Sequence, residues 1–168
     1  MDQRLMIVTF TEAELQKITE WALERRRSHK KGSSRKIASK RSDLEIDTLG
    51  IKGEYVIHQR FGGKWNRHWA NGVMPKWDIE RGDFRCEVKT SFWPEGEFKI
   101  KPWETFHADV GYLVIDEPPN VRIAGCLTRE MFDKIAVKRN MGHSDIPRVV
   151  DQKDLLDPET YFLKNRKL

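Results

Sequence analysis

The feature that most constrains the fold is a run of alternating apolar and polar residues, WDIERGDFRCEVK, over residues 77–89. The alternation is interrupted by Gly82-Asp83, a favoured two-residue turn between antiparallel strands. With this pair at the turn, Asp78 is placed directly opposite Glu87. The pattern therefore predicts a β-hairpin in which two carboxylates face each other.

The two faces of this hairpin differ in chemistry, because neighbouring side chains on a strand point to opposite faces. The face expected in the core carries Trp77, Ile79, Phe84, Cys86 and Val88, and the polar face carries Asp78, Glu80, Arg85, Glu87 and Lys89. Opposed carboxylates with Cβ atoms about 5 Å apart destabilise a sheet unless something neutralises them. A divalent cation would do so, and the polar face is therefore a candidate metal site.

Asp78 together with the triplet Glu87-Val88-Lys89 resembles the signature of the PD-(D/E)XK nuclease superfamily, which includes restriction-like and phage-type endonucleases. The resemblance implies an α/β fold with a restriction-endonuclease-like core, a mixed central β-sheet flanked by helices. It also implies that Asp78 and Glu87 hold Mg²⁺, for which Mn²⁺ can substitute, and that the main-chain carbonyl of Val88 adds a ligand. Lys89 would help to position or activate the attacking water.

Two alternatives to this interpretation remain open. Trp77, and not Pro, precedes Asp78, so Asp83 is the alternative for the first acid. A Glu-x-Lys triplet also occurs on ordinary solvated strands, where the charges form surface ion pairs. An amphipathic edge hairpin without a metal is therefore the alternative to a metal site.

Two helices are expected before the hairpin. A capping-box pattern at Thr11 and Glu14, followed by apolar residues at helical spacing, predicts a helix over 12–27. A second apolar stripe predicts a helix over 44–61, which ends at Gly62-Gly63.

The second expected helix carries Glu54 beside its apolar stripe. A helix acid just before the hairpin, in GIKGEYVIHQRFG, resembles the first-helix acid of many PD-(D/E)XK enzymes, which reaches the metal, often through water. A surface glutamate paired with a lysine or with His58 is the equal alternative. Gly50 and Gly53 each lower helix propensity by about 1 kcal/mol, so we expect the helix to approach the sheet closely there.

Positive charge is concentrated in one segment of the chain. Residues 25–41 contain nine Lys or Arg and no acid, whereas the remaining 22 basic residues are outnumbered by all 26 acidic ones. Such a density predicts contacts with a phosphate backbone, made by a mobile basic arm; a solvated linker is the alternative. The cations expected to bind nucleic acid are Arg25, Arg26, Arg27, Lys30, Lys31, Arg35, Lys36, Lys40 and Arg41, joined by Lys99 and Lys101 from a later strand.

Further strands and a helix are expected after the hairpin. Residues 98–101 alternate like a short strand, residues 109–115 are nearly all apolar like a strand covered on both faces, and residues 121–126 form another strand. Thr128 then caps a helix. This order resembles the tail of phage-type members of the superfamily, and the resemblance covers roughly residues 44–135. We accordingly divide the chain into an N-terminal helix and basic arm, 1–43, and a nuclease-like core, 44–168.

Composition limits the other classes of site. Cys86 and Cys126 lack zinc-ligand spacing and are expected to be buried free thiols. Five of the six tryptophans fall within residues 65–103, where core packing is the favoured role and base stacking the alternative. No run of about 18 apolar residues and no signal-peptide pattern is present, so we expect a cytoplasmic protein that does not enter a membrane.

Together these features predict a Mg²⁺-dependent deoxyribonuclease, an endonuclease whose basic arm grips the nucleic acid. DNA is favoured over RNA by the resemblance alone. One alternative is a catalytically inactive nucleic-acid-binding protein that keeps the nuclease fold. Another is a protein-interaction or inhibitor domain that uses the tryptophans. A monomer and a homodimer are both compatible with the sequence.

Overall fold

The computed structural model describes residues 6–28, 41–67, 69, 76–142 and 145–164. Its centre is a six-stranded sheet built from β1 (Met6–Thr9), β2 (Lys64–Trp65), β3 (Ile79–Arg81), β4 (Phe84–Ser91), β6 (Val110–Glu117) and β7 (Asn120–Thr128). The strands lie in the order β1-β7-β6-β4-β3-β2. Because β4 and β6 are parallel while the other neighbours are antiparallel, the sheet is mixed, as predicted.

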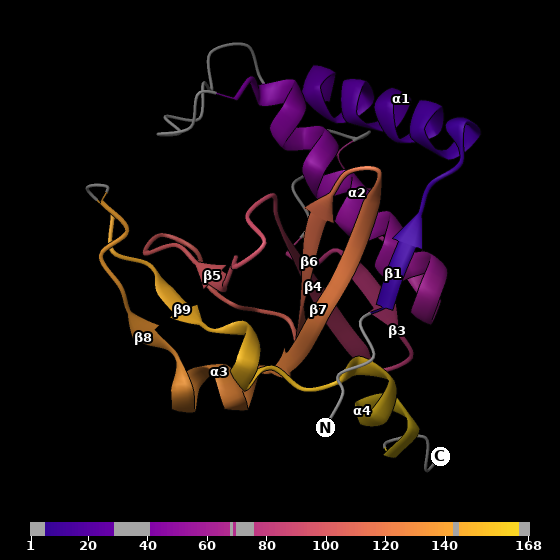
Figure 1. Cartoon of the computed structure of the whole chain (residues 1–168). Coiled ribbons are helices and arrows are strands. Elements are labelled where there is room, and N and C mark those ends of the chain that lie inside the picture. Colours follow the sequence, from indigo (N-terminus) through magenta and orange to yellow (C-terminus); the bar gives the residue numbers. More distant parts are fainter. Residues whose placement is uncertain (1–5, 29–40, 68, 70–75, 143–144, 165–168) are drawn as a thin grey trace.

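Helices α1 (Glu12–Ser28) and α2 (Asp43–Phe61) lie on one side of this sheet (Figure 1). α2 packs against β4 and β6, and α1 packs on α2. Each helix begins with a capping box, Thr11 with Glu14 and Ser42 with Glu45. Both predicted helices are confirmed, because these caps and the apolar stripes agree on the same boundaries.

The opposite side of the sheet is covered by a smaller sheet and a short helix (Figure 1). These elements are β5 (Phe98–Ile100), α3 (Arg129–Ile135), β8 (Val137–Lys138) and β9 (Arg148–Val150), and they are followed by η2 (Gln152–Asp154) and α4 (Pro158–Lys164). The strand at β5 and the helix at α3 are confirmed, and the Thr128 hydroxyl accepts the Met131 N–H at 3.1 Å. The short strands β8 and β9 were not predicted, because two or three residues give no periodicity.

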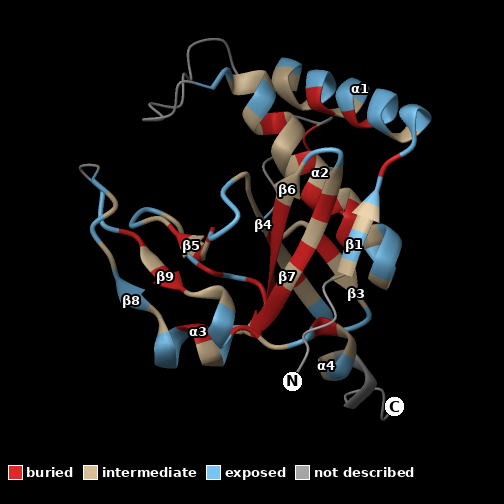
Figure 2. Ribbon diagram, viewed as in Figure 1, coloured by how far each residue is buried: buried red, intermediate tan, exposed pale blue. Residues whose placement is uncertain are grey.

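The core lies on both faces of the main sheet, and the buried residues run along its central strands (Figure 2). β6 alternates between the two faces: Tyr112 and Val114 pack on the helix side, and Leu113 and Ile115 pack on the side of the small sheet. The prediction of a strand covered on both faces is thus confirmed. Gly111 is required in this strand, because a Cβ atom there would lie 2.4 Å from the Phe98 ring.

The N-terminal segment shares this core. β1 pairs with β7 at the edge of the sheet, and Ile18 and Ala22 of α1 belong to the same buried cluster as Ile51 of α2. Residues 29–40, which include most of the predicted basic arm, lie outside the described residues. Among the helices that the structure describes, none combines the length and the apolar composition needed to cross a membrane.

The two cysteines are buried free thiols, as predicted. Burial raises the pKa of both the Cys86 and the Cys126 thiol to about 12. Both thiols are therefore protonated at neutral pH and act as small apolar core groups.

Candidate active site

The predicted hairpin is present in the predicted register. Ile79 pairs with Cys86, and Arg81 pairs with Phe84, on either side of the turn. Gly82 adopts a φ of +57°, which the turn requires and which glycine accepts without strain.

Asp78 departs from the prediction, because the paired strands end at Ile79. The Asp78 N–H donates to the carbonyl of Cys86 at 2.8 Å, and the Asp78 carbonyl accepts from Asn66 at 2.7 Å. The carboxylate instead accepts the Val88 N–H at 2.7 Å. Direct pairing of Asp78 with Glu87 is therefore wrong, although the acid still lies beside the main chain of the Glu-x-Lys triplet.

The division of the hairpin into two faces is correct only in part. Ile79, Cys86 and Val88 are buried on the helix side, as predicted. Phe84 is 40% exposed, because it adjoins the turn at the tip of the hairpin. Trp77 packs on the opposite side of the sheet, since it precedes the paired residues and is not bound to their alternation.

Asp78 and Glu87 are half-buried carboxylates, the first just before β3 and the second in the middle of β4. Desolvation, followed by repulsion from Glu54 and Glu87, raises the pKa of Asp78 well above its ordinary value. Desolvation also raises the pKa of Glu87, against the opposing effect of Lys89. The two acids therefore occupy a site that solvent can reach and in which carboxylate charge is not fully compensated.

Lys89 lies between two carboxylates. Its ammonium is 2.8 Å from Glu87 Oε1 and 3.4 Å from Glu104 Oε2. Desolvation lowers the pKa of Lys89, but the two carboxylates outweigh it and the pKa is raised. Lys89 is therefore held as a cation at neutral pH by the two carboxylates.

Glu54 is an interior residue, so the surface alternative for it is wrong. The side chain is 4% exposed, and both of its oxygens accept from Arg25 Nη2, at 2.8 Å and 2.7 Å. The Trp65 indole N–H donates to Glu54 Oε2 at 2.9 Å. The charge of Glu54 is one of the causes that raise the pKa of Asp78, after desolvation.

The two helix glycines serve this arrangement. A Cβ atom at Gly53 would lie 1.9 Å from the Thr90 hydroxyl, so the expected close approach of the helix to the sheet is confirmed there. At Gly50 the near neighbour is Arg25 Nη1, 3.1 Å from an added Cβ atom. Gly50 therefore leaves room for the guanidinium that reaches Glu54.

Arg25 is consequently not an exposed cation of an arm. Its side chain is 14% exposed, and its guanidinium carbon lies 4.3 Å from the centre of the Trp69 ring. Desolvation lowers the pKa of Arg25, but Glu54 outweighs this and the pKa is raised. The prediction that Arg25 contacts nucleic acid conflicts with this burial, because the guanidinium is already bound within the protein.

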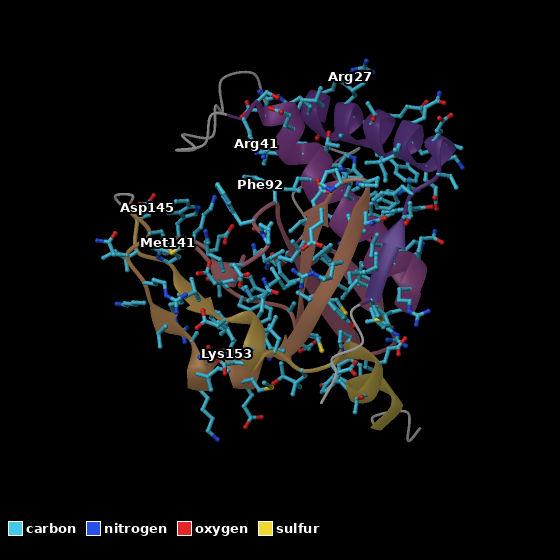
Figure 3. The ribbon with its side chains drawn as sticks, viewed as in Figure 1. Arg27, Arg41, Phe92, Met141, Asp145 and Lys153 are labelled. Atoms are coloured by element: carbon cyan, nitrogen blue, oxygen red, sulfur yellow. The ribbon has the colours of Figure 1, made fainter. Side chains whose placement is uncertain are left out.

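The other predicted nucleic-acid contacts are spread over the surface. Arg27 is exposed on α1, Arg26 pairs with Asp43, and Arg41 stacks on the Phe92 ring at 3.8 Å (Figure 3). Lys99 lies on β5, and Lys101 follows this strand. The remaining predicted contacts lie outside the described residues: Lys30, Lys31, Arg35, Lys36 and Lys40.

The sequence analysis did not predict the structural roles of three residues near the site, namely Glu104, Asp47 and Arg25. Glu104 binds Lys89 from a separate turn, and no local pattern indicates such a contact. Asp47 is 2% exposed on α2 and, with Glu54, contributes to the field at Arg25. The burial of Arg25 did have a signal, because Arg25 continues the buried helical stripe of Ile18 and Ala22.

The geometry distinguishes the two candidates for the first acid. Asp83 is exposed at the tip of the hairpin, whereas Asp78 is half-buried and its carboxylate accepts the Val88 N–H beside Glu87. Within the described residues, however, no three His, Cys, Asp or Glu side chains are arranged so that together they could hold a metal ion. Each acid of the site already has a partner in the protein: Arg25 for Glu54, the Val88 N–H for Asp78 and Lys89 for Glu87.

Comparisons of the chain with protein-family models, with curated proteins and with solved structures find no match.

Proposed function

We propose that this protein is a Mg²⁺-dependent nuclease that hydrolyses phosphodiester bonds in DNA. The observation that carries the proposal is that Asp78 bonds to the main chain of the Glu87-Val88-Lys89 triplet and Lys89 pairs with Glu87, at one half-buried site where the buried acid Glu54 of α2 also acts on the Asp78 pKa. Carboxylates and a fixed lysine at this position agree with the roles that the PD-(D/E)XK resemblance implies. The mixed sheet, with α2 against β4 and β6, supports a restriction-endonuclease-like core.

The charge of the site suits a divalent cation. When ionised, the acids Glu54, Asp78, Glu87 and Glu104, together with the buried Asp47 near Arg25, outnumber the two cations Arg25 and Lys89. Desolvation first, and then the neighbouring acids, raise the pKa of Asp78 and Glu87. A Mg²⁺ ion would offset this excess of negative charge, and carboxylate oxygen is its preferred protein ligand.

Asp78 and Glu87 would hold this ion, each giving up part of its present bonding to Val88 or Lys89. When bound, Mg²⁺ would supply Lewis-acid chemistry, polarising a phosphoryl oxygen and lowering the pKa of water. The carbonyl of Val88 belongs to the same segment of main chain and is the proposed additional ligand.

Lys89 contributes as a cation. Held by Glu87 and Glu104, its ammonium can orient the attacking water and stabilise the negative charge that develops on the phosphate. Arg25 fixes Glu54 in place and so defines the wall of the site on α2. Neither cation needs to lose a proton for these roles.

Cleavage of DNA by the purified protein tests the proposal. We expect cleavage with Mg²⁺ or Mn²⁺, none with EDTA, and none by Asp78→Asn under any of these conditions. Asp83→Asn is the matched control and should cleave like the unmodified protein, because Asp83 is exposed at the hairpin tip. Cleavage by Asp78→Asn would refute the assignment.

A second candidate function is nucleic-acid binding without catalysis. It is favoured by the absence of a ready-made three-ligand arrangement among the described residues, since each acid is already bonded within the protein. DNA binding by a protein that shows no cleavage with either metal would select this function.

A further inference from the structure

Trp93 and Trp103 are strongly exposed although each is held on a closed turn. They are 67% and 63% exposed. The Trp93 carbonyl accepts the Gly96 N–H at 2.8 Å, and the Lys101 carbonyl accepts the Glu104 N–H at 3.0 Å. In both turns a proline, Pro94 or Pro102, occupies the second position and fixes the backbone.

The turn that carries Trp93 is also anchored on the body of the protein. The Pro94 carbonyl accepts from Arg122 at 3.0 Å and from Gln152 at 2.7 Å. The Trp93 N–H donates to the Ser91 hydroxyl at 3.1 Å. An exposed aromatic side chain on a fixed backbone offers a large contact area at a low entropic cost, which is typical of recognition sites.

Both indoles lie close to the candidate active site. The residue after Trp103 is Glu104, whose carboxylate contacts the Lys89 ammonium and accepts the Lys101 N–H at 3.0 Å. Trp93 lies four residues after Lys89, so the two Cα atoms are at most about 14 Å apart. A strand whose phosphate lies at Lys89 would therefore bring neighbouring bases within reach of both rings.

Cations accompany these aromatic side chains. The Lys101 ammonium is 5.3 Å from the centre of the Trp103 ring. Arg41 stacks on Phe92 at 3.8 Å (Figure 3), and the Phe92 ring centre lies 5.7 Å from that of Trp93. The Lys101 ammonium beside the exposed Trp103 ring can therefore pair with a phosphate while the ring stacks on the attached base.

We propose that Trp93 and Trp103 are base-stacking positions that flank the active site, so that the substrate is nucleic acid with unpaired bases. The inference rests on the proposed function and specifies its substrate class. Bases within a duplex already stack on one another, whereas bases of single strands, loops and frayed ends offer a free face to an aromatic side chain. The neighbouring cations favour nucleic acid over an apolar protein partner, which would not need them.

Binding of fluorescently labelled oligonucleotides, measured by anisotropy in EDTA, tests this inference. The probes are a short single-stranded DNA, the RNA of the same sequence, and the DNA duplex. Trp93→Ala and Trp103→Ala should each weaken binding of the preferred single strand by roughly 5- to 150-fold, with little effect on the duplex. Trp103→Phe should retain most of the affinity, because it keeps an aromatic face. Ile7→Ala, at a 58% exposed apolar side chain on the edge strand β1, is the matched control and should change nothing.

Equal losses on single strands and duplex, or unchanged binding of every probe by both alanine variants, would overturn the inference. So would a loss in Trp103→Phe as large as that in Trp103→Ala. Because EDTA removes the metal, these results do not depend on cleavage. If the alanine variants lose single-strand binding but the unmodified protein never cleaves, the stacking positions are upheld and the nuclease proposal is rejected. If the unmodified protein cleaves but the alanine variants bind every probe normally, the nuclease proposal is upheld and the stacking positions are rejected.

Discussion

Replacement of Arg25 by methionine removes a buried guanidinium and keeps a long apolar side chain beside Trp69. Glu54 then stays in the interior without its counter-charge. The Arg25 and Glu54 side chains are only 14% and 5% exposed, so solvent screens their interaction weakly. Removal of one partner from such a pair costs about 3–5 kcal/mol. For a chain of 168 residues, this corresponds to a fall in Tm of roughly 6–20 °C.

Circular dichroism during thermal and urea unfolding, in EDTA at neutral pH, measures this loss. Arg27→Met is the matched control in the same helix, because Arg27 is exposed, and it should shift the unfolding free energy by less than about 0.5 kcal/mol. Addition of Glu54→Gln to Arg25→Met should recover part of the stability, because the buried charge is then absent.

Charge compensation of Glu54 by Arg25 is refuted if Arg25→Met is no less stable than Arg27→Met. It is also refuted if Glu54→Gln lowers the stability of Arg25→Met further. Either result would mean that the guanidinium does not compensate Glu54 in the folded protein.

Three further predictions concern the acid, the lysine and the arm. Desolvation and the nearby acids raise the pKa of Asp78, so the folded protein binds this proton more tightly than the unfolded one, and the ionised side chain costs stability at neutral pH. Asp78→Asn should therefore raise Tm at neutral pH in EDTA. The gain should vanish below about pH 4, where Asp78 is protonated in both the folded and the unfolded protein. A lower Tm of Asp78→Asn at neutral pH would contradict this cost of the ionised side chain. Lys89→Ala should lower kcat by about 100-fold or more while DNA affinity changes little, because the cation acts on charge that develops in the transition state; equal losses of rate and affinity would make Lys89 a simple phosphate contact. Neutralisation of the arm cations Arg27, Lys30 and Lys31 should reduce the slope of log affinity against log salt concentration by about 0.9 for each lost contact with duplex DNA. An unchanged slope would show that the arm is a solvated linker.

The hairpin shows why much of the fold could be predicted from the sequence. A two-residue turn fixes the register of its strands, and the alternation of Ile79, Cys86 and Val88 fixes the buried face. The position of Asp78 was not predicted correctly, because its main chain leaves the regular strand pairing and forms hydrogen bonds with Asn66 and Cys86. Patterns within an element were thus reliable, and the end of the element was not.

The partners of the site residues were harder to predict. The charge of Arg25 suggested an exposed cation, although its place on the stripe of Ile18 and Ala22 indicated burial. Glu104 could not be found, because its contact with Lys89 depends on how the turn after β5 docks on the main sheet. Such contacts arise from tertiary packing, and neither periodicity nor spacing encodes them.

The most direct test of the central assignment is a titration with Mn²⁺, followed by electron paramagnetic resonance of the free ion. We predict that the unmodified protein binds Mn²⁺ at a site that Mg²⁺ competes for. Asp78→Asn and Glu87→Gln should each weaken this binding by more than about tenfold. Loss of a group that merely supports a metal ligand already costs about 10- to 100-fold in affinity, and these substitutions change the ligands themselves. Asp83→Asn should leave the binding unchanged. Equal binding by Asp78→Asn and the unmodified protein would contradict the assignment of the metal to this hairpin.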